Sequence, residues 1–224
     1  LINHEYASVL EEFAEFGYKI FYRNPISTNI IKAANKKNGI LQQKDFSNYR
    51  VIFRQPVCDH FLQHKVCSMG EPSSGALTML QILKIIEPNP SWHNYIEASK
   101  LAFSDRNYYM ADPDYIESPG IRLLDDKYIS ERRAILKDNK ILDNPDHGQP
   151  SNWKNNSLYI NQEYEEKGTT HISIIDRFGN AISMTSTIEN SFGSRIMANG
   201  YLLNNELTDF SFLPWKDNKK IANR

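Results

Sequence analysis

The feature that most constrains the fold of this chain is an abrupt change of pattern at Gly168. Residues 138–168 are rich in Asn, Asp, Pro, Gln and Ser, with glutamates near the end, which is typical of an exposed connector with little core of its own. From Thr169 to Ile175 polar and apolar residues alternate, and this alternation predicts a strand. Residues 176–180 include a glycine suited to a hairpin turn, so we expect 181–188 to return as a second strand.

The residues before the connector combine helical and extended patterns. Apolar residues recur at helical spacing before a stop at Gly17, and Pro25 is placed to begin a second helix. Further helices are expected after Ser73-Ser74 through Ile86, from Trp92 to Asp105 and from Tyr128 to Leu136, and strands at 49–54, 64–68 and 200–205. Within the connector, Trp153 and Tyr159 are the residues expected to anchor it locally.

Composition and charge exclude several classes of partner. The 224 residues carry 26 lysines and arginines against 27 acids, so the net charge of −1 gives no reason to expect nucleic acid or an anionic membrane surface. No apolar run approaches the roughly 20 residues that span a bilayer. The first residues lack the basic and apolar regions of a signal peptide.

Several polar residues and both cysteines are expected to have structural roles. Cys58 and Cys67 fit no zinc or redox spacing, so we expect two ordinary thiols in or near strands, with a single disulfide as the alternative if the protein is exported. One of the two serines before the helix at Gly75 is placed to cap it. Asp105 and Arg106 are interpreted as a structural ion pair.

The junction at Gly168 and Thr169 also has a chemical interpretation. The hydroxyl of Thr169 can attack the preceding carbonyl, where glycine adds no side-chain bulk, and water can then hydrolyse the resulting ester. The new chain would begin with Thr169, which carries a hydroxyl nucleophile and an α-amine whose pKa of about 8 suits a general base. Gly-Thr-Thr at the start of a strand is common, so this tripeptide alone favours an ordinary hairpin.

The surrounding sequence resembles the start of the small subunit of γ-glutamyltranspeptidases (glutathione hydrolases), which are N-terminal-nucleophile hydrolases. The matching stretches are Gly168-Thr169-Thr170-His171-Ile172-Ser173-Ile174-Ile175-Asp176, Gly179-Asn180-Ala181, Ser191-Phe192-Gly193-Ser194 and 202–211. Upstream, Pro72-Ser73-Ser74-Gly75 and 102–106 are similar to parts of the large subunit. The resemblance covers most of the chain and is weakest in the connector. It identifies 1–137 as large-subunit-like, 138–168 as the connector ending at the cleavage site, and 169–224 as small-subunit-like.

This resemblance implies roles for individual residues. Thr169 takes the position of the nucleophile generated by cleavage after Gly168, and Thr187 takes that of a second threonine that steadies it. Glu206 and Asp209 match positions that hold the α-amino group of a γ-glutamyl substrate, which suits two neighbouring carboxylates. His171 is expected to point to the opposite sheet face and to be structural.

Position 189 departs from the family pattern. Glu189 stands where well-studied members have an asparagine that also contacts the substrate. A third acid there favours an ammonium group, or it shifts the preference to another acyl group, as in the related acylases. The alternatives to γ-glutamyl transfer are a related acylase on another acyl amide, which this departure favours, and a non-catalytic fragment that lacks the family's arginine anchor and oxyanion hole.

The resemblance also implies an α+β fold, the four-layer α/β/β/α sandwich of N-terminal-nucleophile hydrolases, incomplete in this chain. This chain has no counterpart of three features that the resemblance implies: the carboxylate-binding arginine, the Ser-Ser pair and the Gly-Gly oxyanion hole. We therefore expect an internal segment of a longer protein. Alone, such a segment should turn over little substrate and should tend to associate with its missing portions. No metal or organic cofactor is implied. The implied partners are a γ-glutamyl substrate such as glutathione and an acceptor amine or water. The chain itself does not indicate its compartment; for a complete bacterial parent protein the resemblance implies the periplasm.

Overall fold

The computed structural model describes residues 2–138, 140–154, 168–209, 215–216 and 218–220. The chain is a mixed α+β protein that divides into two compact units. Unit 1 comprises Leu1–Ile52 with Tyr164–Thr208, and unit 2 comprises Phe53–Glu163 with Asp209–Arg224. Each unit is described by itself.

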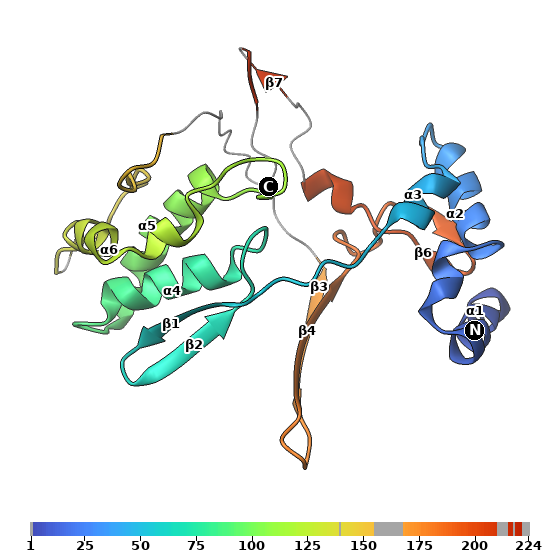
Figure 1. Cartoon of the computed structure of the whole chain (residues 1–224), viewed down its shortest axis with the longest axis horizontal. Coiled ribbons are helices and arrows are strands. Elements are labelled where there is room, and N and C mark those ends of the chain that lie inside the picture. Colours follow the sequence, from blue (N-terminus) through green and yellow to red (C-terminus); the bar gives the residue numbers. More distant parts are fainter. Residues whose placement is uncertain (1, 139, 155–167, 210–214, 217, 221–224) are drawn as a thin grey trace. The chain divides into compact units, whose positions relative to one another are not determined.

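Unit 2 is built around helix α4 (Gly75–Ile86) (Figure 1). This helix packs against α5 (Trp92–Tyr109), α6 (Asp126–Arg133) and the 3-10 helix η2 (Gly120–Leu124). It also packs against the hairpin of β1 (Val57–Phe61) and β2 (His64–Ser68). A short hairpin of β7 (Trp215–Lys216) and β8 (Lys219–Lys220) also belongs to this unit. Because α4 is covered on several sides, most of its residues are buried. At its start the hydroxyl of Ser73 accepts a hydrogen bond from the N–H of Gly75 at 3.2 Å.

A buried ion pair joins α5 to α6. Asp105 Oδ1 lies 3.1 Å from Arg132 Nη2, and the two side chains are 0% and 4% exposed. The expected pair of Asp105 with Arg106 is wrong, because the Asp105 carboxylate pairs with Arg132. Arg106 instead donates to the side chain of Asn107 at 3.0 Å.

The first half of the expected connector is packed onto this core. Trp153 is 7% exposed and belongs to the main hydrophobic cluster, which confirms its anchoring role. Gly148 donates its N–H to Asp105 at 2.8 Å and accepts a hydrogen bond from the hydroxyl of Tyr109 at 2.6 Å. Tyr159, the second expected anchor, lies outside the described residues.

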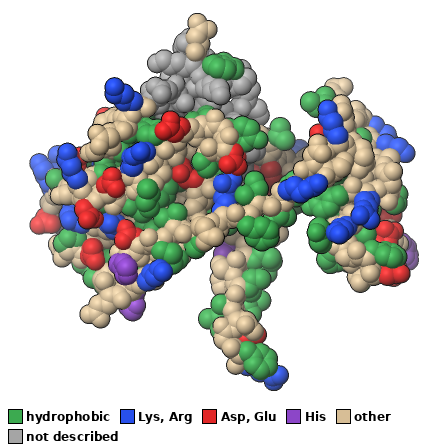
Figure 2. Space-filling model, viewed as in Figure 1, with side chains coloured by type: hydrophobic (Ala, Val, Ile, Leu, Met, Phe, Trp, Pro, Cys, Tyr) green, Lys and Arg blue, Asp and Glu red, His purple; other side chains and the backbone are tan. Residues whose placement is uncertain are grey.

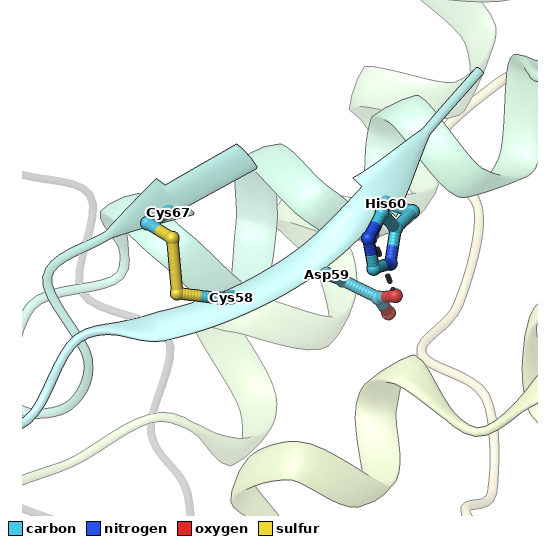
Figure 3. The surroundings of a disulfide bond; sticks show 4 residues. All are labelled: Cys58, Asp59, His60 and Cys67. Carbon is cyan, nitrogen blue, oxygen red and sulfur yellow. Dashed lines mark hydrogen bonds between the residues drawn. A yellow bond between two sulfur atoms is a disulfide. The ribbon is translucent and has the colours of Figure 1, made fainter. Parts of the chain in front are cut away.

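Cys58 and Cys67 form a disulfide, so the expectation of two separate thiols is wrong (Figure 3). The two residues face each other directly in the β1–β2 register, with Cα atoms 4.1 Å apart. The register follows from a tight turn at Leu62-Gln63, where Leu62 has a φ of +53°. Strand β1 was missed in the sequence, and the strand expected at 49–54 is irregular backbone whose side chains at 51–53 are exposed.

Unit 1 contains the helices α1 (His4–Phe16), η1 (Tyr18–Tyr22), α2 (Ile26–Asn35) and α3 (Gln43–Asn48), the strands β3 (Thr169–Ile175), β4 (Ala181–Thr187), β5 (Met197–Ala198) and β6 (Tyr201–Leu202), and the 3-10 helix η3 (Glu206–Asp209), whose last residue falls in unit 2. The β5–β6 turn joins the two sequence-distant halves of unit 1. Asn199 donates to the carbonyl of Ile26 at 3.2 Å, and Asn3 donates to the carbonyl of Gly200 at 2.7 Å. Of the strand expected at 200–205, only Tyr201–Leu202 forms.

The β3–β4 hairpin has the predicted strands and turn. Asp176 closes the turn by accepting the N–H groups of Phe178 and Asn180 at 2.8 and 2.9 Å, and Gly179 has the expected positive φ of +83°. All residues of both strands are exposed. One face, which we call the apolar face, carries four exposed large side chains: Ile172, Ile174, Ile182 and Met184. Figure 2 shows hydrophobic side chains along the hairpin.

Candidate functional site

The two threonines expected at the site face each other at the open end of the β3–β4 hairpin. Thr169 begins β3, Thr187 ends β4, and the two form the last pair of the antiparallel register. The hydroxyl of Thr169 donates to the hydroxyl oxygen of Thr187 at 3.2 Å. The contact restrains the rotamer of the Thr169 hydroxyl, which suits a nucleophile.

Gly168, which precedes the nucleophile position, occupies a backbone conformation that requires glycine. Its φ is +108°, outside the region that L-residues with a side chain normally adopt. A Cβ atom built there would lie 3.1 Å from both the carbonyl oxygen of Glu189 and the nitrogen of Ser191. Both neighbours are backbone atoms, so they cannot move aside by changing a rotamer. The backbone around Gly168 is therefore closely packed against residues 189–191.

The loop after β4 connects Thr187 to position 189. Glu189 has a φ of +68°, the left-handed region, which is unfavourable for a residue with a long side chain. Its N–H donates to the hydroxyl oxygen of Thr187 at 2.8 Å. Thr187 thus accepts from both the Thr169 hydroxyl and the Glu189 backbone, and it fixes the two relative to each other.

Asn205 holds this loop from the other side and was missed as a functional residue. Its side-chain amide donates to the Glu189 carboxylate and, at 3.1 Å, to the hydroxyl of Thr208. Its side-chain carbonyl accepts the N–H of Asn190 at 3.0 Å, and its own N–H donates to the carbonyl of Ile188 at 3.3 Å. The sequence signal that could have found it is the Asn204-Asn205 pair shortly after the strand at Tyr201–Leu202, because an amide side chain can donate and accept hydrogen bonds at once.

The two remaining acids occupy η3. Glu206 follows Asn205 directly, is half-buried, and donates its N–H to the side chain of Asn204 at 3.1 Å. Asp209 is the last residue of η3, and its side chain lies outside the described part of the chain. Hydrogen bonds therefore join Thr169, Thr187 and Glu189, while the substrate-binding roles of all three acids stay predictions.

The expectation that His171 points away from Thr169 is wrong. Residues two apart on a strand share a face, so His171 lies on the same side of the hairpin as Thr169 and Thr187. Its Nδ1 is 2.9 Å from the hydroxyl of Thr185, and its Nε2 is 3.1 Å from that of Ser183. These contacts agree with the structural role expected for the imidazole.

Comparison with known proteins identifies the family. The model of the family described as gamma-glutamyltranspeptidase matches residues 1–224. The chain belongs to this family. The glutathione hydrolase proenzyme of Bacillus subtilis (strain 168) is 30% identical over 241 residues, covering 100% of the chain, and that of Escherichia coli (strain K12) is 32% identical over 227 residues, covering 96%. The chain is thus homologous to glutathione hydrolase enzymes.

Among solved structures, the cephalosporin acylase from Bacillus halodurans matches 99% of the chain with a TM-score of 0.79 and 25% identity, over 40% of its own length. The chain spans 41% of the Bacillus subtilis relative and 37% of the Escherichia coli relative. Within the described residues, no helix has the length and apolarity to cross a bilayer. Nor do these residues group three His, Cys, Asp or Glu side chains in a way that could hold a metal ion.

Proposed function

We propose that this chain carries the nucleophile of a γ-glutamyl-transferring and γ-glutamyl-hydrolysing enzyme, and that it exposes this nucleophile by cutting itself between Gly168 and Thr169. The observation that carries the proposal is the contact of Thr169 with Thr187 directly after a glycine that is closely packed in a positive-φ conformation. Family membership supports it, because the relatives are named glutathione hydrolase proenzymes.

The self-cleavage step uses only groups of the chain and one water molecule. Thr169 Oγ1 attacks the carbonyl carbon of Gly168, the C–N bond breaks, and the nitrogen takes a proton, which leaves an ester between the two residues. Water then hydrolyses the ester to give the Gly168 carboxylate and a Thr169 with its hydroxyl and α-amine. Thr187, by accepting the Thr169 hydroxyl hydrogen bond, holds Oγ1 in one rotamer for this attack.

Turnover follows the same chemistry with an external amide. The α-amine of Thr169, with a pKa of about 8, takes the hydroxyl proton, and Oγ1 attacks the γ-carbonyl of a substrate such as glutathione. The amine product leaves, and the acyl group on Thr169 passes to water or to an acceptor amine in a second half-reaction.

The acids at positions 189, 206 and 209 are proposed to bind the α-ammonium group of the substrate. The groups that complete the site in the family, an arginine for the α-carboxylate and an oxyanion hole, are proposed to come from portions of the parent protein beyond this segment. Each missing oxyanion donor costs about 10²–10³ in rate, so turnover by this segment alone should be very low. In the complete protein the β3–β4 hairpin is proposed to join the four-layer sandwich, which would cover its apolar face.

A second candidate is an acylase acting on a different acyl amide. Two observations favour it: the carboxylate at Glu189 in place of the family's asparagine, and the structural match to a cephalosporin acylase. A comparison of γ-glutamyl anilide with glutaryl anilide separates the two candidates, because only the former carries an α-ammonium group. Equal turnover of both anilides would reject the claim that Glu189 binds ammonium.

The test of the proposal is a search for a new N-terminus at Thr169 after incubation of the purified chain, with Thr169→Ala as control. Cleavage in the wild type that the alanine variant lacks supports the proposal. If the wild-type chain stays whole and releases nothing from γ-glutamyl anilide, this segment is a non-catalytic remnant.

A further inference from the structure

Six hydrogen bonds involve the side chain and backbone of Asn205, and three of them reach the loop that follows β4. The amide donates to the Glu189 carboxylate, the side-chain carbonyl accepts from Asn190 N–H, and the backbone N–H donates to Ile188. We propose that Asn205 is a positioning residue: it fixes the Glu189 loop so that the Glu189 N–H stays on Thr187, which in turn orients Thr169. This inference rests on the proposed function of Thr169 as a nucleophile.

The backbone of Glu189 explains why the loop needs such support. A glutamate with a φ of +68° is in a sparsely populated conformation, which persists only when its surroundings hold it there. Two hydrogen bonds do so, one from its N–H to Thr187 and one from Asn205 to its carboxylate. Loss of the second removes one of the two hydrogen bonds that hold Glu189 itself, while the contacts of Asn205 with Asn190 and Ile188 remain.

The chemistry at position 205 requires an amide. A carboxylate of the same shape could still accept from Asn190 N–H, but it could not donate to Thr208, whose own hydroxyl donates to the Asn205 backbone carbonyl, and it would repel Glu189. Asn205→Asp therefore removes the two hydrogen bonds that the amide donates, to Glu189 and to Thr208, and keeps those that reach Asn190 and Ile188. The double variant Glu189→Gln with Asn205→Asp rebuilds the pair with its ends exchanged, because the glutamine amide can donate to the aspartate.

The chain offers a matched control one residue away. Asn204 is exposed, and its side-chain oxygen accepts from Glu206 N–H at 3.1 Å, a contact that a carboxylate keeps. Asn204→Asp therefore adds the same charge and keeps the hydrogen bond from Glu206 N–H. Any effect of charge alone should appear in both single variants.

The first measurement is hydrogen exchange of the Glu189 N–H by NMR in the uncut Thr169→Ala background, which needs no activity. We expect exchange about tenfold faster with Asn205→Asp, since a hydrogen bond to a charged group contributes at least about that factor. Asn204→Asp and the exchanged pair should stay within about threefold of the parent. Unchanged exchange with Asn205→Asp, or no recovery in the exchanged pair, would overturn the inference.

The second measurement is the rate of cutting after Gly168 with Thr169 intact. We expect Asn205→Asp to slow the cut about tenfold and the exchanged pair to restore it. A normal cutting rate in Asn205→Asp, with faster exchange at Glu189, would reduce Asn205 to a structural residue and refute the positioning role. A wild-type chain that never cuts refutes the proposed function instead, and the exchange measurement still decides whether Asn205 holds the loop.

Discussion

Replacement of Arg132 by methionine should destabilise unit 2 far more than the same change at Arg106. Arg132 Nη2 lies 3.1 Å from Asp105 Oδ1, and it also donates to the carbonyls of Leu101 and Asp146 at 3.0 Å each. Methionine fills similar space but leaves a fully buried carboxylate without its cation. Breaking a buried pair in this way costs about 3–5 kcal/mol of unfolding free energy.

Two further variants locate the cause. In Arg132→Met with Asp105→Asn, no charge is left behind and the asparagine oxygen can still accept from Gly148 N–H, so the loss should fall below about 2 kcal/mol. Arg106→Met should cost about 1 kcal/mol or less, because Arg106 bonds a neighbouring asparagine and not Asp105. Urea unfolding at pH 7 measures all three.

The pH dependence gives an independent check. Burial raises the pKa of Asp105, and a carboxyl whose pKa is raised in the folded state lowers stability above that pKa. The stability of Arg132→Met should therefore rise as the pH falls through that raised pKa. A loss under about 1 kcal/mol for Arg132→Met, or an equal loss for Arg106→Met, would refute the assigned pairing.

Three other changes have defined outcomes. Reduction of the Cys58–Cys67 disulfide should lower the free energy of unfolding by up to about 2.6 kcal/mol, the chain-entropy value for a separation of nine residues. Urea unfolding with and without reductant measures this loss, and an unchanged midpoint would contradict it. Hydrogen bonds, first from the Asn180 side chain, lower the pKa of Asp176, so the hairpin turn should loosen only as the pH falls through that lowered pKa. Faster hydrogen exchange of the Asn180 N–H would show the loosening. Equal protection of this N–H above and below the lowered pKa would contradict the role of Asp176 in closing the turn. We expect the exposed apolar face to drive self-association of the chain, and Ile174→Thr should weaken it, because Ile174 is 54% exposed on that face. Sedimentation across concentrations tests this, and no difference between the variant and the wild type would contradict it.

Local pattern was sufficient to predict the parts of the fold that depend on neighbours in sequence. The β3–β4 hairpin and its turn follow from alternation and one glycine, and helices α4 and α5 follow from apolar runs bounded by turn residues. The prediction for His171 was wrong because the same alternation places residues 169 and 171 on one face of the strand.

Features that depend on distant partners were not predictable in this way. Arg132 reaches Asp105 from another helix, and no local spacing indicates that contact. The disulfide required strand β1 and its two-residue turn to be recognised first, because the register alone sets Cys58 opposite Cys67. Asn205 was missed because its importance comes from the left-handed backbone of Glu189, which the sequence does not reveal.

The most direct test of the central claim is the intact mass of the purified chain over a long incubation at neutral pH. The account predicts that the 26.0 kDa species gives way to two fragments, 1–168 and 169–224, and that Thr169→Ala stays whole. A wild-type chain that remains at 26.0 kDa throughout, or a cut at any bond other than Gly168–Thr169, would contradict it.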